Sequence, residues 1–348
     1  MTRAKLQIGL IGAGQMGRGH IACLKRIDEI DLRALADPHE PSIRQTLEAV
    51  GGEVAVYDDY RDLLSRADVE AVIVATPNFT HADIVVDALA AGKHVLCEKP
   101  MATTPEDCDR MIAARDQSGK ILQIGLELRS DAAMRKVHDL LRAGEIGRPW
   151  SLWIKEFRGP FLLKVDRWIT KKDRSGDTLV EKDCHHYDLF NWFADSPVRY
   201  AAAFGGCDVE LDHSDVLDNA WTIQEHANGA RSALGLCMFA DRSPHGPEVG
   251  VIGSEGMIVH QYGGPVRLYP RRDNAERLHD VTVPPDIAPL SHNGAVYYEH
   301  LSWLSAIREG APVRVTGEIG RESVIVGLAC QRAIAERRVV DLDKEFRS

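Results

Sequence analysis

The residues of this sequence that could do chemistry fall into a few short segments, of which the first is a glycine-rich turn. The run Gly12–Gly17 reads Gly-Ala-Gly-Gln-Met-Gly, follows a short apolar stretch and opens a helical pattern. In that setting Gly12 permits a tight turn, Gly14 lets backbone approach a pyrophosphate, and Gly17 permits close packing of helix on strand. The start of the helix would supply oriented N–H groups and partial positive charge. The turn therefore predicts a dinucleotide site, and a glycine-rich turn without a ligand is the alternative.

An aspartate lies at the position where a dinucleotide site would need one. Asp37 ends a second apolar run and follows Gly17 by twenty residues. A carboxylate there can accept hydrogen bonds from the adenine ribose hydroxyls and would repel a 2′-phosphate. Arg44 lies nearby in the sequence and could favour NADP, but the carboxylate favours NAD as the cofactor. The alternative role of Asp37, which precedes a proline, is a helix cap.

Two further segments follow apolar runs of the strand type. Ala75–Asn78 (Ala-Thr-Pro-Asn) follows one run, and Glu98–Pro100 (Glu-Lys-Pro) follows the next. In open α/β sheets ligands bind beyond the carboxyl ends of the strands, so both segments should flank the nicotinamide. Glu98 and Lys99 should face different directions, because side chains alternate along an extended backbone. A lysine at that rim can stabilise a developing alkoxide, although composition alone would favour an ordinary surface lysine.

The last chemical cluster is Glu181–Asp188, which reads Glu-Lys-Asp-Cys-His-His-Tyr-Asp. If the segment is one helix, Glu181, His185 and Asp188 stand on one face. A histidine between two carboxylates is a plausible proton acceptor, since the negative charges would raise its pKa. A metal site is disfavoured, because neighbouring residues of a helix point ~100° apart and His185 and His186 could not readily share one ion. A satisfied core histidine is the alternative for His185.

A basic stretch precedes this cluster. Residues Lys155–Arg174 hold seven basic and three acidic side chains, a local charge of +4 in a chain of net charge −10. One interpretation is a clamp for an anionic sugar formed by Arg158, Lys164 or Arg167, with Trp168 stacking on a sugar ring or the nicotinamide. The other is a solvated loop or a subunit contact with a core tryptophan, which is the usual role of a charge run.

The elements that must position these residues alternate in the first third of the chain. Strands are expected at Leu6–Ile11, Leu32–Ala36, Ala71–Ala75, His94–Cys97 and Ile121–Gly125, and helices at Met16–Ile27, Ala82–Ala90 and Glu106–Gln117. Strands that alternate with helices imply crossover connections and a parallel sheet covered on both faces. We therefore expect a doubly wound Rossmann domain over residues 1–125.

Longer strands with partial period-2 alternation follow. They are expected at Trp150–Phe157, Ala230–Phe239, Val249–Ile252 and Met257–Gln261, with a hairpin turn at Gly253–Gly256 and final helices near Ala295–Arg308 and Glu318–Arg337. This pattern predicts an α+β domain over 126–348 with a large, mostly antiparallel open-faced sheet, whose last helices return toward the first domain. His300 and Trp303 fall on a helix spaced like a buried face, so both are read as structural, with His300 a minor candidate for the site.

Composition excludes several classes of function. The hydrophobic fraction of 44% and the charged fraction of 27% are those of a globular protein, and the net charge of −10 disfavours nucleic acid or an anionic membrane as a partner. No apolar run approaches the ~18 residues of a spanning helix. The start of the chain, Met1–Lys5, has the charge of a signal peptide but leads into no credible cleavage site. Seven scattered cysteines without a Cys-x-x-Cys pair indicate reduced thiols and a cytoplasmic protein.

The sequence resembles, essentially end to end, the oxidoreductase family named after glucose–fructose oxidoreductase, inositol dehydrogenase and a rhizopine-catabolism protein. The resemblance rests on Gly12–Gly17, Ala75–Asn78 with His81, Ala91–Val95 leading into Glu98–Pro100, and Asp188 three residues after His185. In one departure, many members carry Asp four residues before the histidine, where this sequence has Glu181. Some relatives have Glu-Lys-Cys-Cys-His, close to the run here except for Asp183.

The resemblance implies a classical dinucleotide domain and an α/β domain whose open sheet supports substrate and oligomer contacts, in a homodimer or homotetramer. It places Lys99 and His185 at the catalytic lysine and histidine positions. The expected reaction moves a hydride between a secondary hydroxyl of a sugar, sugar derivative or cyclitol and the nicotinamide. His185 would take the hydroxyl proton, Lys99 would stabilise the alkoxide, and Glu181 or Asp183 would orient His185 or an adjacent hydroxyl.

The expected contacts can be stated as two sets. The cofactor, NAD rather than NADP, is expected to contact Gly12, Gly14, Gln15, Met16, Gly17, Asp37, Thr76, Pro77, Asn78, His81, Glu98 and Lys99. The substrate is expected to contact Lys99, Arg158, Lys164, Arg167, Trp168, Glu181, Asp183 and His185. Two other functions stay open: a hydrolase or lyase that oxidises a glycoside transiently and retains its NAD, and a non-catalytic NAD-binding regulator.

Overall fold

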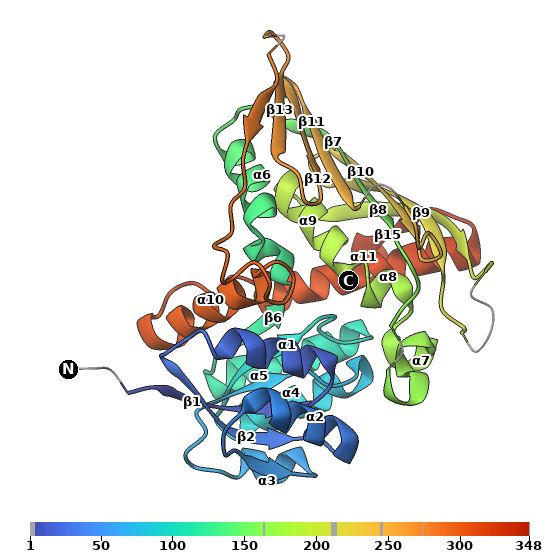
Figure 1. Cartoon of the computed structure of the whole chain (residues 1–348). Helices are drawn as coiled ribbons and strands as arrows, with labels where there is room; N and C mark the ends of the chain where they lie inside the picture. The colour runs from blue at the N-terminus through green and yellow to red at the C-terminus, as the bar shows by residue number, and fades with distance from the viewer. Residues whose placement is uncertain (1–3, 163, 210–213, 244–245, 274, 348) are drawn as a thin grey trace. The chain divides into compact units, whose positions relative to one another are not determined.

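The chain forms two compact units in the computed structural model, which describes residues 4–162, 164–209, 214–243, 246–273 and 275–347 (Figure 1). The first unit comprises residues up to Asp131 together with Val283–Arg321, and the second comprises Ala132–Thr282 and the chain from Glu322 onward. Residues 283–321, which the sequence-based division assigned to the second domain, thus belong to the first unit. Residues 1–3, part of the basic start Met1–Lys5 of the chain, lie outside the described part.

The first unit is built on a parallel sheet with the order β3-β2-β1-β4-β5-β6 in the described residues. Its strands are β1 Leu6–Ile11, β2 Ile30–Ala36, β3 Ala55–Tyr57, β4 Ala71–Val74, β5 His94–Glu98 and β6 Leu122–Gly125. β1 pairs with β2 on one side and with β4 on the other, so the strand order reverses at this point. A crevice for ligands opens beyond the carboxyl ends of the strands at such a reversal.

Helices connect these strands. They are α1 Gln15–Leu24, α2 Glu40–Val50, α3 Tyr60–Leu64, α4 His81–Ala90 and α5 Pro105–Ser118, with the short 3₁₀ turn η1 Asn78–Thr80. The 3₁₀ turn η2 Glu127–Ser130 and the helix α10 Ala295–Glu309 belong to the same unit and follow its last strand. Local sequence explains their ends. The Thr104 side chain caps α5 by accepting the Asp107 N–H, Pro105 follows at the first helical position, and Gly119 ends the helix in a left-handed conformation.

The core of the first unit lies between the sheet and its helices. β4 is buried along its whole length, as expected of a central parallel strand. Leu10, Ile73 and Leu96 of three adjacent strands join one apolar cluster with Trp303 of α10, which is fully buried. The structural reading of Trp303 is therefore confirmed.

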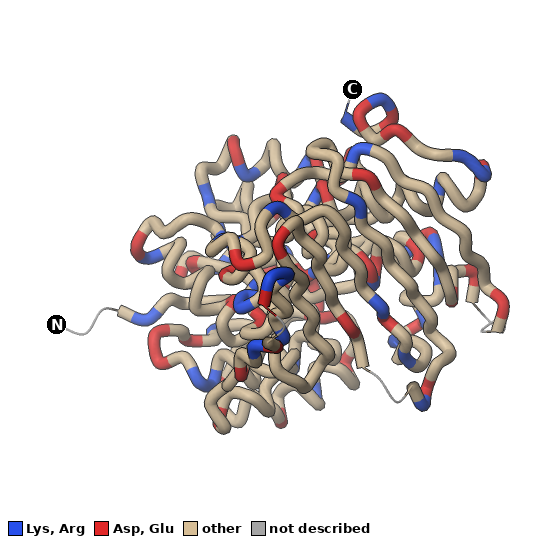
Figure 2. The backbone as a smooth tube through the Cα atoms, turned by 90° about the horizontal axis from the view of Figure 1, so that it is seen from above, with Lys and Arg blue, Asp and Glu red and all other residues tan. Residues whose placement is uncertain are grey.

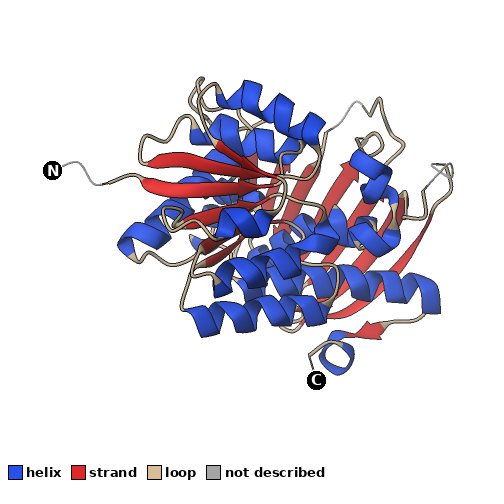
Figure 3. Ribbon diagram, turned by 90° about the horizontal axis from the view of Figure 1, so that it is seen from below, coloured by secondary structure: helices blue, strands red, loops and turns tan. Residues whose placement is uncertain are grey.

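The second unit is built on a sheet with the order β14-β13-β12-β11-β7-β10-β9-β8-β15 in the described residues. Figure 3 draws the strands of both units in red. Its strands are β7 Pro149–Phe157, β8 Val198–Gly206, β9 Asn219–His226, β10 Arg231–Cys237, β11 Glu248–Gly253, β12 Gly256–Gln261, β13 Val266–Pro270, β14 Arg277–His279 and β15 Val340–Asp341. β7 and β10 pair in parallel, and the other described pairs are antiparallel. The expected fold class, a doubly wound domain followed by a mostly antiparallel sheet, is confirmed.

Helices cover one face of this sheet, as Figure 1 shows for α6, α9 and α11. The helices of this part of the chain are α6 Ala132–Arg142, α7 Lys172–Ser175, α8 Thr178–Glu181, α9 Cys184–Ala194, α11 Gly317–Glu336 and α12 Leu342–Glu345, with the 3₁₀ turn η3 Val165–Thr170. Along β9 the residues alternate strictly between buried and exposed. Trp221 and Ile223 on the exposed face are 60% and 61% accessible, and Phe204 of β8 is 78% accessible.

The distribution of charge and apolar residues agrees with a globular protein. Figure 2 shows basic and acidic residues interspersed along the chain, rather than one sign gathered in one segment. None of the helices within the described ranges has the length and the apolar character that crossing a bilayer requires.

Candidate active site

The glycine-rich turn has the geometry that a pyrophosphate site needs. Gly12 has a φ of +104°, and a Cβ there would lie 2.5 Å from the Ala75 carbonyl oxygen. A Cβ on Gly17 would lie 2.2 Å from the Gly12 carbonyl oxygen, so helix α1 packs directly on the turn. At Gly14, the residue before α1, a Cβ would meet nothing within 4 Å. The backbone at Gly14 therefore faces open space beside the helix N-terminus carried by Gln15 and Met16, and the dinucleotide fits this turn.

Asp37 at the end of β2 fixes the shape of this turn. Its Oδ2 accepts the Ala13 N–H at 2.7 Å, and its Oδ1 accepts the His39 N–H at 2.8 Å. Each oxygen keeps a second lone pair, so the carboxylate remains able to accept a ribose hydroxyl. The residue that caps α2 is His39, whose side chain accepts the Ser42 N–H, and the helix-cap alternative for Asp37 is therefore wrong. Arg44 instead pairs on the surface with Glu40 at 3.0 Å.

A buried histidine ties together the two loops that follow β4 and β5. The Nδ1 of His81 lies 2.9 Å from the Pro100 carbonyl oxygen, and its Nε2 lies 3.0 Å from the Thr76 carbonyl oxygen. Pro77 precedes the turn η1, whose first residue, Asn78, is buried. His81 thus acts from the start of α4 as a brace between these two loops, and its contact with the cofactor stays a prediction.

Glu98 and Lys99 leave β5 in different directions, as expected. Glu98 is the last residue of the strand and is buried, whereas Lys99 is half-buried. The Lys99 N–H donates to Oε2 of Glu98 at 3.1 Å, and the bond from Lys99 to Pro100 is cis. Lys99 therefore stands at the same edge of the sheet as the glycine turn and the Thr76 loop, with its backbone held by the neighbouring carboxylate.

A buried polar cluster lies behind Glu98, and its main member was not predicted. The Nε2 of His20 on α1 lies 2.9 Å from Oε1 of Glu98, and its Nδ1 lies 2.8 Å from the Nε2 of His300 on α10. Both histidines are fully buried. His20 carried no signal in the sequence beyond its place in the fingerprint helix, because its partners lie 78 and 280 residues away. His300, a minor candidate from sequence, contacts His20 rather than the cofactor loops.

The charges in this cluster are set by burial and by close partners. Burial opposes ionisation of Glu98, but the hydrogen bond and charge of His20 and the charge of Lys99 outweigh it and lower the pKa of Glu98. Burial, with the nearby Glu98 and Glu127 charges, raises the pKa of Glu299 well above its usual range. Burial, then the charge of His20, lowers the pKa of His300 well below its usual range. At neutral pH Glu98 is therefore an anion, whereas Glu299 and His300 are uncharged.

The predicted histidine site in the second unit is not one continuous helix. Glu181 ends α8, and α9 begins at Cys184, with Lys182 and Asp183 forming the break. The expected spacing of Glu181, His185 and Asp188 on one helical face is therefore wrong. His185 and Asp188 share α9 one turn apart, and Glu181 approaches from a separate helix. All three side chains are buried.

The side chain of Asp183 is hydrogen-bonded to that of His186. The two side chains meet at 2.8 Å, and the other ring nitrogen of His186 lies 3.7 Å from Glu156 of β7. Glu156 in turn lies 3.4 Å from the Lys182 amine. Burial opposes ionisation of Glu156, but the charges of Lys182, His186 and Arg158 outweigh it and lower its pKa. Asp183 thus orients His186. One expectation from the sequence was that it would orient His185.

Several side chains of the basic stretch are already paired within the second unit. Lys155 lies 2.9 Å from Glu248, Arg158 lies 3.5 Å from Glu156, and Lys172 lies 3.2 Å from Asp177. Arg167 is exposed, with a left-handed φ of 51°. Trp168 and Lys164 are half-buried in the same turn. Arg158 thus has Glu156 as a partner, and the clamp for an anion formed by Arg158, Lys164 or Arg167 stays a prediction.

The residues that the structure describes form no cluster of metal-ligating side chains. Among them, no three His, Cys, Asp or Glu side chains are grouped so that they could hold an ion. The described hydrogen bonds of His186 also show that the tandem histidines have separate surroundings.

Comparison with known proteins decides the family. An oxidoreductase family with an NAD-binding Rossmann fold matches residues 6–126, and its C-terminal alpha/beta domain matches residues 138–342. The chain belongs to this family. It is accordingly an NAD(P)-dependent oxidoreductase, and the recognition made from its motifs is confirmed.

Several similar proteins are named as dehydrogenases. Myo-inositol 2-dehydrogenase of Thermotoga maritima is 28% identical over 344 residues, which cover 97% of this chain and 99% of that protein. Inositol 2-dehydrogenase of Salmonella typhimurium is 37% identical over 189 residues, 54% of each chain. A crystal structure of levoglucosan dehydrogenase with NADH and levoglucosan superposes with a TM-score of 0.85 over 97% of this chain and 99% of that one. At 22% identity, this last likeness shows a shared fold.

Proposed function

We propose that this oxidoreductase is an NAD-dependent dehydrogenase of a secondary hydroxyl in a sugar, sugar derivative or cyclitol. The observation that carries the proposal is the placement of Lys99. It follows β5 at the sheet edge that holds the glycine turn, and its N–H is bound by the buried Glu98. The named activity of the full-length Thermotoga maritima relative, a cyclitol dehydrogenase, supports the substrate class.

The residues of the first unit fit the cofactor. The open backbone at Gly14 and the N-terminus of α1 would hold the pyrophosphate. The free lone pairs of Asp37 would accept the ribose hydroxyls and disfavour a 2′-phosphate, so NAD is preferred over NADP. The Thr76–Asn78 loop and Lys99 would flank the nicotinamide, braced by His81. When bound, NAD supplies the acceptor for the hydride.

The remaining roles belong to the chain's own side chains. Lys99 orients the substrate hydroxyl and stabilises the alkoxide by its charge. His185 takes the hydroxyl proton as general base. Glu181, carried on the separate helix α8, orients His185 or an adjacent hydroxyl. The assignment of Lys99 and His185 follows the resemblance to the family, and their local surroundings are compatible with it.

Lys164 and Arg167 are proposed to recognise an acidic group on the substrate, with Trp168 beside them. Their turn holds two consecutive left-handed residues, Asp166 and Arg167, and such backbone strain concentrates at functional sites. Arg167→Ala should raise KM for a sugar acid by about tenfold, the range for one charge-assisted contact, and leave KM for the neutral analogue unchanged. Equal effects on both would assign the stretch to a solvated loop.

The deciding experiment follows NADH formation with NAD and a panel of neutral sugars, cyclitols, sugar acids and glycosides, with product analysis of each mixture. NADH that accumulates with one class, and is lost in Lys99→Met, supports the proposal. A glycoside cleaved without net NADH would instead indicate retained NAD and a hydrolase or lyase. NAD binding without any turnover would favour a regulator.

A further inference from the structure

A continuous hydrogen-bonded chain runs through the interior of the first unit and ends at the backbone of Lys99. It begins at the Nε2 of His300, which lies 2.8 Å from the Nδ1 of His20. The Nε2 of His20 lies 2.9 Å from Oε1 of Glu98, and Oε2 of Glu98 accepts the Lys99 N–H at 3.1 Å. Three elements distant in the sequence, α1, α10 and the end of β5, are thereby tied to one another.

Because this series of hydrogen bonds lies in the protein interior, Glu98 needs the hydrogen bond from His20 in order to stay ionised. A carboxylate removed from water is strongly disfavoured unless hydrogen bonds and opposite charges compensate. Glu98 is only 5% exposed, and the imidazole of His20 is its buried side-chain donor. The other titratable groups that act on Glu98 or are acted on by it are Lys99, His292, Glu127, Glu299, Cys97 and His81. Of these, Glu127 and Glu299 are carboxyl groups and would oppose its ionisation.

The directions of the hydrogen bonds follow from the carboxylate. Glu98 can only accept, so His20 presents Nε2–H to it. The Nδ1 of His20 lies 2.8 Å from the Nε2 of His300, whose own pKa is lowered so that it stays neutral. The charge on Glu98 therefore orients the ring of His20, and the two rings in turn fix the position of the carboxylate.

We propose that His20 and His300 are positioning residues for Lys99, which keep Glu98 ionised and in place so that its second oxygen holds the Lys99 backbone. His20 acts on Glu98 directly, and His300 acts by holding the ring of His20. Neither histidine contacts substrate in this scheme. The proposal rests on the proposed role of Lys99 and adds to it the groups that set its position.

Two substitutions of His20 separate positioning from simple loss of packing. His20→Leu removes the donor, so the pKa of Glu98 should rise, and kcat should fall by ~10- to 100-fold, within the range for a misplaced catalytic group. The acid limb of the kcat–pH profile should move up by about one pH unit or more, because activity now waits for ionisation of Glu98. His20→Gln keeps an N–H donor near the Nε2 position and should recover kcat to within about threefold.

His300→Leu and a distant control complete the series. In His300→Leu the hydrogen bond from His20 to Glu98 can still form, but the ring of His20 loses its second partner. The loss of kcat and the shift of the acid limb should therefore be about a third of those in His20→Leu, or less. His226→Leu in the second unit removes another buried histidine, which bonds to Ser196 and Ser232. It should lower thermal stability without moving the pH profile. The proposal is wrong if His20→Leu leaves the kcat–pH profile unchanged. It is also wrong if the kcat of His20→Gln is as low as that of His20→Leu.

A second measurement does not depend on turnover. At neutral pH, the infrared spectrum of His20→Leu should gain a carbonyl band of a protonated buried carboxyl group. The buried, protonated Glu299 gives a band of this kind in every variant. The additional band of His20→Leu should be absent from the wild-type protein and from the double variant His20→Leu, Glu98→Gln. No new band would overturn the proposal even if the wild-type protein is an active dehydrogenase. A new band in a protein that turns over no substrate would leave the link from His20 to Glu98 intact and overturn only the function.

Discussion

Oδ1 of Asp183 lies 2.8 Å from the Nδ1 of His186, so the fully buried carboxyl group of Asp183 belongs to His186 and not to His185. On its far side, His186 approaches Glu156 at 3.7 Å. The tandem histidines thus have different surroundings although they are neighbours in the sequence. His186 forms a buried polar network with Asp183 and Glu156, and the proposed role of general base therefore stays with His185.

Substitutions at these two neighbouring positions should therefore affect different properties. Asp183→Ala leaves His186 without its closest partner, and we expect a loss of ~3 kcal/mol in the free energy of unfolding, typical of a broken buried pair. The kcat should fall by less than about tenfold, because no reacting group is removed. His185→Ala should lower kcat by ~10²- to 10⁴-fold, as for loss of a general base, with a smaller change in stability. Urea unfolding and NADH formation measure the two effects, and the reverse pattern would assign the base role to His186.

The glycines of the phosphate turn should separate folding from cofactor binding. Gly17→Ala places a Cβ 2.2 Å from a backbone carbonyl oxygen, so we expect a loss of more than ~2 kcal/mol in stability. Gly14→Ala meets nothing within 4 Å, so its stability should stay within ~1 kcal/mol of wild type. The methyl group of Gly14→Ala would instead occupy the open space above the turn and should weaken NADH binding by about tenfold. Thermal unfolding and NADH fluorescence titration test both. An unchanged NADH affinity in Gly14→Ala would show that the pyrophosphate does not bind beside Gly14.

Most strands of the first unit could be predicted because they are short, mostly apolar runs. The expected strand Leu6–Ile11 coincides with β1, and the expected run Ala71–Ala75 differs from β4 by one residue. By contrast, α2 and β3 lie on partly exposed segments and were not assigned. The strand β9 was also missed, because its polarity is the reverse of its burial. Its buried face carries Thr222, Gln224 and His226, whereas the apolar Trp221 and Ile223 are exposed.

The chemical residues divide in the same way. The turn Gly12–Gly17 could be predicted because its shape depends on the local backbone. Lys99 was placed at the end of a strand, but its catalytic role rests on the family resemblance and stays a prediction. The break between Glu181 and Cys184 could not be found, since Lys182 and Asp183 are both compatible with a helix. His20 could not be found because its role is defined by Glu98 and His300, which only the tertiary fold brings to it.

The buried carboxyl group of Glu299 should make stability fall as pH rises. Neither of its oxygens has a hydrogen-bond partner among the described residues, and burial keeps the group protonated in the native state. The unfolded chain releases this proton near pH ~4.3, so above that pH the native state binds more protons than the unfolded state. The free energy of unfolding therefore loses a contribution as the pH rises toward the native pKa. Glu299→Gln removes the effect, and its stability relative to wild type should increase with pH.

Glu318 provides a control of opposite sign for the same urea titrations. Hydrogen bonds from Arg115 lower its pKa to about 2. Its contribution is present above the unfolded value of ~4.3 and is lost as the pH falls through about 2. Glu318→Gln should therefore be less stable than wild type at neutral pH and equal to it near pH 2. Parallel pH curves for Glu299→Gln and wild type would mean that Glu299 is ionised in the fold.

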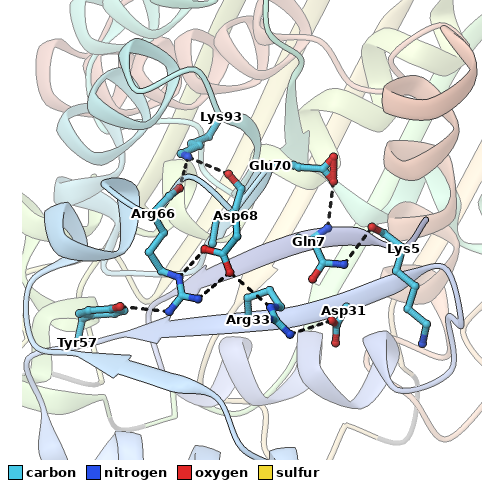
Figure 4. A network of polar contacts seen from close by, with 10 residues as sticks. Lys5, Gln7, Asp31, Arg33, Tyr57, Arg66, Asp68, Glu70 and Lys93 are labelled. Atoms are coloured by element: carbon cyan, nitrogen blue, oxygen red, sulfur yellow. Dashed lines mark hydrogen bonds and ion pairs between the residues drawn. The ribbon is translucent and has the colours of Figure 1, made fainter.

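A lysine at the opposite edge of the first sheet should affect stability alone. Lys93 precedes β5, and its buried amine donates to the carbonyl oxygens of Arg66 at 2.6 Å and of Val69 at 2.8 Å, as Figure 4 shows. Lys93→Met leaves both carbonyl groups unsatisfied, so we expect a loss of ~1–3 kcal/mol in the free energy of unfolding. NADH affinity should not change, because ligands bind at the carboxyl ends of the strands. Lys25→Met, at an exposed position, should stay within ~0.5 kcal/mol of wild type. A loss of NADH affinity in Lys93→Met would contradict this separation.

The exposed face of the second sheet should hold a second copy of the chain. Phe204 pairs across the strands with Trp221, and Ile223 continues the same face of β9, so three large apolar side chains that are each at least 60% accessible lie together. A soluble protein rarely leaves such a patch uncovered, and a sheet face with its aromatic residues is suited to a self-complementary dimer contact. Trp221→Lys combined with Ile223→Lys should lower the mass observed by sedimentation to that of one chain, 38.5 kDa. Val339→Lys, at an exposed apolar residue outside the sheet, should leave the mass unchanged. A wild-type protein that sediments as a single chain would show that this face has another partner.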